Sequence, residues 1–240
     1  MTYLELCKFV HRFCGSGDAL PGTAPTTTVG QTGYLYEITQ WVNDAYGDIQ
    51  KEQSQWAFMN DTVNGQSLNS VSGASFSFLV AQIPDIDEVL PFKDRNGNRY
   101  ITVYPLASGV SASTPVWYED YSVWRGFRDR GTIPTGTPTS FTLAPDKSIL
   151  LYPNAPNINY LLSFNYRRTV DVLSGDSATP IFPERYHDAI AWRAIWLWAI
   201  QRRELNMYEM AKREFETSMD QLRREQLPEM TFNQTLYFAP

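Results

Sequence analysis

The fold is decided by residues 183–227, which read PERYHDAIAWRAIWLWAIQRRELNMYEMAKREFETSMDQLRREQL. Apolar side chains recur through this stretch every three or four residues, which is the spacing of one face of an α-helix. Pro183 suits the first helical position, because the N–H group that proline lacks has no helical partner there. Asn206, with Glu209 three residues later, has the form of a new helix cap. We therefore expect the helix to break near Leu205.

Two more helices are predicted at the start of the chain. Thr2 and Glu5 have the spacing of a capping box, in which each side chain accepts a hydrogen bond from the backbone N–H of the other residue. A loop rich in Gly, Pro and Thr, residues 15–32, then separates two runs with helical periodicity. The apolar positions of these runs are Tyr3, Leu6, Cys7, Val10, Phe13 and Cys14, followed by Leu35, Ile38, Val42, Ala45, Ile49 and Trp56.

Between the predicted helices, residues 57–170 have the pattern of a β module. Many Gly, Pro, Ser and Thr residues separate short runs that alternate or are rich in aromatic side chains. Asn96-Gly97 favours a two-residue hairpin turn, because both residues tolerate the positive φ angles of a type I′ turn. The strand candidates are Phe76–Pro84, Ile86–Phe92, Arg99–Pro105, Pro115–Phe127, Ser140–Leu143, Ser148–Tyr152 and Tyr160–Val170.

This order of elements predicts an α+β fold. Helices from both ends of the chain form a bundle, and an antiparallel β module, either a sandwich or a small barrel, is inserted between them. The 240 residues are enough for two such units. We place the helical domain at residues 1–58 and 171–228, the β module at 59–170, and an extended C-terminal tail at 229–240.

Composition and charge exclude several classes of protein. The chain carries 20 basic and 26 acidic side chains, a net charge of −6. Because phosphate contacts need clustered Lys and Arg, we expect no specific binding of nucleic acid. No apolar run approaches the about 20 residues that span a bilayer, and the start of the chain does not have the pattern of a signal peptide. We therefore expect no membrane association.

Catalytic and metal-binding motifs are scarce. No P-loop, dinucleotide-binding glycine motif or zinc-protease motif occurs, so we expect no enzyme, no catalytic residues and no cofactor. Cys7, His11 and Cys14 would place three soft ligands on one helical face, but zinc takes four ligands and His187 is the only other histidine. Small, buried core residues explain the two cysteines better, so we expect no metal site.

A dense aromatic run lies in the β region, at Trp117, Tyr118, Tyr121 and Trp124. One interpretation is two strands whose aromatic faces point into the core. The other is a carbohydrate platform or a protein interface, because aromatic rings combine a large apolar area with polar edges. We favour the core interpretation and keep these four residues as a possible interface where they are exposed.

The last twelve residues, 229–240, are unusual for a chain end. The helical pattern stops at Pro228, and Glu229 is the only charged residue beyond it. Disordered ends are normally polar and charged, so an apolar end indicates docking, either on the chain's own domain or on a neighbour. The bulky apolar residues of this segment are Met230, Phe232, Leu236, Tyr237 and Phe238.

The ordered set of packing patterns resembles the head-to-tail adaptor (connector) proteins of tailed bacteriophages, in the group that includes tail tubular protein A. The resemblance covers almost the whole chain and is weakest over residues 65–136. The segments that carry it are Thr2–Leu6, Gly33–Ile49 with Trp56–Phe58, Leu150–Pro156, Tyr160–Arg168, Pro180–Ile190 and Glu204–Ala211.

The resemblance implies a structural virion protein rather than an enzyme. Such subunits form a homo-oligomeric ring, usually a dodecamer, that docks on the portal protein and contacts a tail or nozzle protein below. The ring is part of the conduit for DNA ejection, and DNA passes through it without specific binding. The implied location is the virion neck, after assembly in the host cytoplasm. In this family the C-terminal segment inserts into the portal, which makes the apolar residues of 229–240 a portal-docking interface.

Further expectations follow for the parts of the chain. The helical residues 1–56 and 180–227 should form the ring body, with the β module projecting toward the tail. The aromatic run would then be a tail-side or subunit interface. The alternative function is a virion-associated carbohydrate-binding or glycan-hydrolysing module, which would use the same aromatic run.

Overall fold

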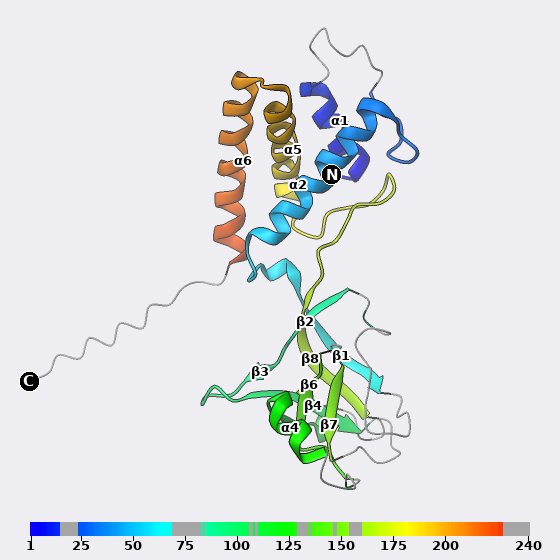
Figure 1. The fold of residues 1–240 in the computed structure, drawn as a ribbon, viewed down its shortest axis with the longest axis vertical. Helices are drawn as coiled ribbons and strands as arrows, with labels where there is room; N and C mark the ends of the chain where they lie inside the picture. Colours follow the sequence, from blue (N-terminus) through cyan, green and yellow to red (C-terminus); the bar gives the residue numbers. More distant parts are fainter. Residues whose placement is uncertain are drawn as a thin grey trace, which may run out of the picture. The chain divides into compact units, whose positions relative to one another are not determined.

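The chain forms two compact units, shown in Figure 1. One unit joins Met1–Met59 to Val170–Pro240, and the other is the continuous segment Asn60–Thr169. Helices precede and follow an antiparallel-rich sheet along the chain, so the predicted α+β class is confirmed. The computed structural model describes residues 1–14, 24–68, 83, 85–105, 108, 110–128, 134, 136–145, 148–153 and 160–227.

The helical unit is organised around α5. Its helices are α1 (Tyr3–Cys14), α2 (Gly33–Glu52), α5 (His187–Arg202) and α6 (Leu205–Gln226), with 3-10 turns η1 (Ala57–Met59) and η3 (Glu184–Tyr186). Because α5 packs against α1, α2 and α6, it has no single face turned to water and its sequence is apolar on most sides. None of the described helices is long and apolar enough to cross a membrane.

The predicted capping box is present at the start of α1. The backbone N–H of Thr2 donates to Glu5 Oε2 at 2.7 Å, and the N–H of Glu5 donates to Thr2 Oγ1 at 3.3 Å. These bonds satisfy N–H groups that the first turn of a helix leaves without partners. The capping box is therefore confirmed.

The predicted break near Leu205 is also confirmed, but its cause is different. Arg203 has the left-handed φ of 60° and its N–H bonds to the carbonyl groups of Ala199 and Ile200, which ends α5. Helix α6 then begins at Leu205, with Glu204 at the cap position and no side-chain cap bond. The predicted cap at Asn206 is wrong, because after the left-handed turn the new helix starts two residues earlier, with Glu204 at the cap.

An extended segment returns from the β module and is held by amide side chains of α2. Asn43 donates from Nδ2 to the Leu173 carbonyl at 3.2 Å and accepts the Leu173 N–H at 3.0 Å. Gln50 donates from Nε2 to the Asp171 carbonyl at 3.0 Å and accepts the Asp171 N–H at 2.8 Å. Each amide therefore replaces the partner that a neighbouring strand would supply, and the segment stays paired without a sheet.

Trp56 closes the C-terminal end of α2 from outside the helix. We expected it in the helical stripe, but α2 ends at Glu52 and the indole folds back into the core with no exposed surface. Its Nε1–H donates to the Ile49 carbonyl at 2.9 Å. The last carbonyl groups of a helix have no helical partner, so this bond satisfies one of them.

The β module contains one sheet with the strand order β1-β8-β4-β5-β6-β7. Strand β2 pairs with β8 and β3 pairs with β4, and among the described strands only β5 and β6 run parallel. The sequence did not distinguish between a sandwich and a small barrel for this module. The strands are β1 (Asn60–Leu68), β2 (Ile86–Leu90), β3 (Phe92–Lys93), β4 (Arg99–Pro105), β5 (Thr114–Tyr118), β6 (Ser140–Leu143), β7 (Ile149–Tyr152) and β8 (Tyr160–Arg168), with η2 at Val110–Ala112 and α4 at Tyr121–Arg128.

The predicted strands differ from the observed ones at β1 and in the second half of Pro115–Phe127, and one further candidate is not tested. Strand β1 was missed because its sequence, NDTVNGQSL, is mostly polar. The predicted strand Pro115–Phe127 is wrong in its second half, since Asp120 accepts the N–H of Ser122 at 2.9 Å and starts α4. The candidate Phe76–Pro84 lies outside the described residues, apart from Ile83, which is buried.

The hairpin between β3 and β4 is a three-residue loop rather than the predicted two-residue turn. Gly97 has a positive φ of 84°, but Asn96 does not, and a type I′ turn needs both. Asp94 sets the geometry, because its Oδ1 accepts the N–H groups of Asn96 and Asn98 at 2.8 Å each. The Gly97 N–H closes the turn on the Asp94 carbonyl at 3.1 Å.

Candidate functional site

The aromatic run is divided between the two faces of the sheet and a helix. Trp117 on β5 is 40% exposed, whereas Trp124 on α4 is only 4% exposed. Tyr118 points to the other face of β5 and its ring centroid lies 5.5 Å from that of the buried Phe141. Tyr121 stacks on Trp124 with centroids 6.4 Å apart. The run therefore contributes both to the packing of the module and to its surface, and its role as an interface stays a prediction.

Trp117 is part of an aromatic stripe that the sequence analysis did not find. Cross-strand pairing places Tyr100 beside Trp117 and Phe92 beside Tyr100. The ring centroids are 5.5 Å apart in the first pair and 5.6 Å apart in the second. Only the strand register brings these three residues together, because they lie far apart in the sequence. The stripe widens the exposed aromatic surface beyond Trp117.

The predicted portal-docking residues Met230, Phe232, Leu236, Tyr237 and Phe238 lie outside the described residues. The described chain ends just after α6, where the Leu227 N–H bonds to the Arg223 carbonyl at 3.0 Å and the side chain packs against the helical core. Arg223 also donates to Glu52 at the end of α2. The last turn of α6 is thus tied to the last turn of α2.

A surface hollow of about 360 Å³ lies between α2, α5 and α6, and we call it the α2–α5–α6 hollow. Its aromatic part comes from α5 and α6, and its charged part comes mainly from the last two turns of α2. Sequence analysis did not identify it, because its residues belong to three helices that only tertiary packing brings together. It is lined by Asp48, Lys51, Glu52, Arg193, Trp196 and Phe215.

Arg193 is held rigidly inside the α2–α5–α6 hollow. Its Nε and Nη2 donate to Asp48 Oδ2 at 3.1 and 2.7 Å. The guanidinium carbon lies 4.3 Å from the ring centroid of Trp196 and 5.7 Å from that of Phe215, within cation–π range of both. Asp48 balances this cation, so the hollow combines aromatic walls with a charge that is already neutralised.

Lys51 differs from Arg193, because it has no hydrogen bond or ion pair with any residue in the described part of the chain. The other charged residue of the rim, Glu52, is bound to Arg223. Lys51 is therefore the cation of the hollow that can pair with an incoming acidic group.

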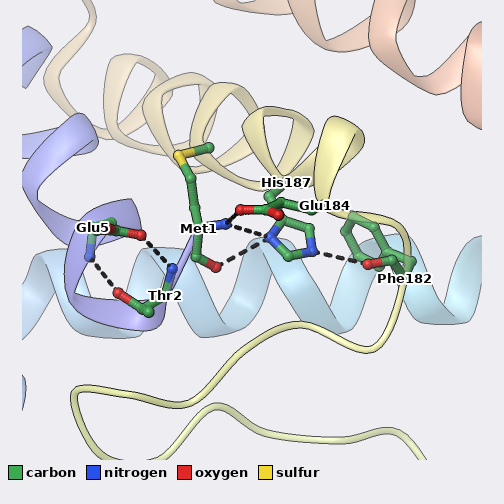
Figure 2. Close-up of polar contacts among 6 residues, drawn as sticks. All are labelled: Met1, Thr2, Glu5, Phe182, Glu184 and His187. Carbon is green, nitrogen blue, oxygen red and sulfur yellow. Dashed lines mark hydrogen bonds and ion pairs between the residues drawn. The ribbon is translucent and has the colours of Figure 1, made fainter.

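His187 is one of the chain's two histidines, and contacts on both ring nitrogens hold it in place (Figure 2). Nε2 donates to the Phe182 carbonyl at 2.8 Å, and Nδ1 lies 2.9 Å from the amino nitrogen of Met1. That amino group also donates to Glu184 Oε1 at 3.0 Å. Burial lowers the pKa of His187, so the neutral ring accepts the Met1 hydrogen at Nδ1. Both nitrogens join parts of the fold that are distant in the sequence or in neighbouring elements.

The cysteines of the C-x3-H-x2-C pattern lie in the helical core. Cys7 has no exposed surface and Cys14 is 3% exposed. Burial raises the pKa of each thiol to about 12, which keeps the thiols protonated, whereas zinc binds the thiolate. The described residues contain no group of three His, Cys, Asp or Glu side chains placed to hold a metal ion.

Comparison with known proteins identifies one family. The family model described as SU10 adaptor protein matches residues 1–235. The matched region includes the helices at both ends and the whole β module between them. No curated protein matches the chain.

Proposed function

The chain belongs to the SU10 adaptor protein family, and we propose that it forms a ring that docks on the portal and carries part of the DNA conduit to the tail. At the level of the family, the chain is a structural adaptor protein of a bacteriophage. The family implies a location at the virion neck and assembly with portal and tail proteins. The observation that carries the proposal is the match over residues 1–235, because it includes both units rather than one shared domain.

We assign the ring body to the helical unit and the tail-facing contacts to the β module, in a ring of twelve copies. The aromatic stripe of exposed Trp117 and half-buried Tyr100 and Phe92 supports a protein contact on the module, since aromatic residues are enriched at interfaces. This stripe would meet a tail or nozzle protein, or a neighbouring subunit.

The net charge supports a conduit that does not hold DNA. Each copy carries −6, and a ring of copies multiplies this charge around the channel. A negative channel wall repels phosphate groups, so DNA passes without specific binding. The engagement of both His187 nitrogens and the burial of both thiols support a structural subunit that is not an enzyme.

The C-terminal tail supplies the proposed anchor on the portal. Its five bulky apolar residues, fully buried in a groove, could contribute on the order of 1.5–3 kcal/mol each, although ordering the segment offsets much of this. One tail should therefore bind weakly. A ring of tails would bind tightly, because the first docked subunit raises the effective concentration of the others.

The decisive experiment mixes the purified chain with DNA-filled heads that carry portals. We expect electron microscopy to show a ring of subunits on each portal vertex. Deletion of residues 229–240 should leave a folded, soluble subunit that no longer attaches. Rings that form elsewhere on the head would contradict the proposed function. Attachment of the truncated chain as strong as that of the full chain would contradict the role of the tail.

A further inference from the structure

The α2–α5–α6 hollow lies near the C-terminal end of α6, the last described helix before the tail. Glu52 lines the hollow and also accepts a hydrogen bond from Arg223 in the last turn of α6. Figure 1 shows α6 ending beside the C-terminal end of α2. Residues 228–240 can span up to about 40 Å when extended. Phe215, on the α6 side of the hollow, is about 18 Å from Leu227 along the helix. Phe232 is five residues beyond Leu227 and can lie up to about 17 Å from it when that stretch is extended, so its ring can reach the hollow.

The chemistry of the tail matches that of the hollow. The tail has aromatic and aliphatic side chains, Glu229 as its one acidic residue, and no Lys or Arg. The hollow has aromatic walls from Trp196 and Phe215, and at its rim Lys51, which has no ion pair or hydrogen bond with the described residues. An acidic group followed closely by an aromatic ring is the ligand that this combination accepts.

We propose that, in the unassembled subunit, the chain's own tail docks in the α2–α5–α6 hollow. Glu229 pairs with Lys51, and Phe232, the first aromatic residue after α6, packs against Trp196 and Phe215. A volume of about 360 Å³ is near the small end of ligand pockets, so the hollow takes a few side chains of the tail rather than all of it.

The tail of the same copy is favoured over that of a second copy. A short tether gives an effective concentration on the order of millimolar, well above the concentration of other copies in a dilute solution. Even a weak contact is then mostly formed within one chain. Docking covers apolar side chains that would otherwise face water and associate with other surfaces. The proposal concerns the isolated chain and does not depend on portal binding.

The test uses the full chain and follows chymotryptic cleavage after Phe232. In Lys51→Glu the rim repels Glu229, and we expect cleavage to accelerate about two- to five-fold, the size of one exposed ion pair. The charge swap Lys51→Glu with Glu229→Lys should return the rate to that of the unmodified chain. Lys8→Glu is the matched control, because Lys8 is an exposed lysine of α1 that does not line the hollow.

A second readout is acetylation of Lys51 by an amine-reactive ester, normalised to Lys8 in the same molecule. Phe232→Ser should raise the relative reactivity of Lys51, since its partner segment is released. Equal cleavage rates in the unmodified chain, Lys51→Glu and the charge swap would overturn the proposal. Acceleration by Lys8→Glu as large as by Lys51→Glu would also overturn it. Protection that grows with protein concentration would show a neighbour's tail in the hollow and overturn docking within one chain.

Discussion

The two units differ in how the chain builds them. The β module is one continuous segment, Asn60–Thr169, whereas the helical unit joins two segments that the module separates. The core of the helical unit therefore contains residues from both ends of the sequence, such as Leu6 and Ile190. The core of the module uses only its own strands. This comparison shows that the helical unit depends on contacts between two segments that the module separates, whereas the contacts of the module, including the pairing of β1 with β8, all fall within one continuous segment.

The largest test of this difference is removal of the module. The ends of the inserted segment lie side by side, because Asn60 pairs with Arg167 across β1 and β8. Replacing residues 60–169 by a short glycine-rich linker should therefore leave a helical unit that melts cooperatively. Circular dichroism measures this as a retained helical signal with one transition. Loss of all helical signal would show that the helical unit needs the module in order to fold.

A core truncation in each unit should destabilise that unit alone. Trp56 has no exposed surface and donates a hydrogen bond to Ile49, so we expect Trp56→Ala to lower the free energy of unfolding of the helical unit by about 3–5 kcal/mol. Phe164→Ala is the matched change in the module core, where Phe164 is equally buried. Calorimetry should show a different transition shifted by each variant. A shift of both transitions by either variant would mean that the units unfold together.

The amide contacts of α2 give a smaller effect with a more specific origin. Asn43→Ala removes both hydrogen bonds to the Leu173 backbone and leaves a buried N–H without a partner, which costs about 1–3 kcal/mol. Gln40→Ala, at an exposed position of the same helix, should change stability by less than about 0.5 kcal/mol. Chemical denaturation compares the two variants, and equal midpoints would argue against a role for the amide in holding the return segment.

The smallest expected effect is a pH dependence of the stability of the helical unit. Burial lowers the pKa of His187 in the folded chain, whereas the unfolded value is about 6.5. The unfolded state therefore binds the proton first, so stability is constant above about pH 6.5 and falls as the pH drops toward the folded pKa. His187→Gln removes this titration and should flatten the dependence between pH 5 and 7 in thermal melts. An unchanged slope in that variant would assign the effect to other groups.

The sequence predicted the helices well because their signals are local. Thr2 and Glu5 form the expected capping box three residues apart, and the break near Leu205 is where the pattern placed it. Strand β4 also has the predicted bounds, since alternation over seven residues is visible without knowledge of its partners. The same local method missed the polar strand β1. It also read α4 as strand, because aromatic residues favour strands in general while Asp120 decides the helix start here.

The candidate sites also divide into features that the sequence indicated and features that only the tertiary structure revealed. The ordered set of sequence segments resembles phage adaptor proteins, and the family match over residues 1–235 supports a phage structural adaptor. The α2–α5–α6 hollow, the aromatic stripe of Phe92, Tyr100 and Trp117, and the two contacts of His187 could not be read from the sequence. Each depends on residues that lie far apart along the chain.

The sequence by itself therefore determined the α+β class, the presence of α1, α2, α5 and α6 and the apolar character of the tail. These features follow from interactions within a few residues or from composition. Both are the same however the distant parts of the chain are arranged in space. The tertiary structure alone decided that Lys51 lies beside aromatic walls from two other helices, with no partner among the described residues. It also decided that Asn43 and Gln50 replace a missing strand. Contacts of this kind exist only after helices from both ends of the chain have packed, because no local pattern encodes which distant residue will lie alongside.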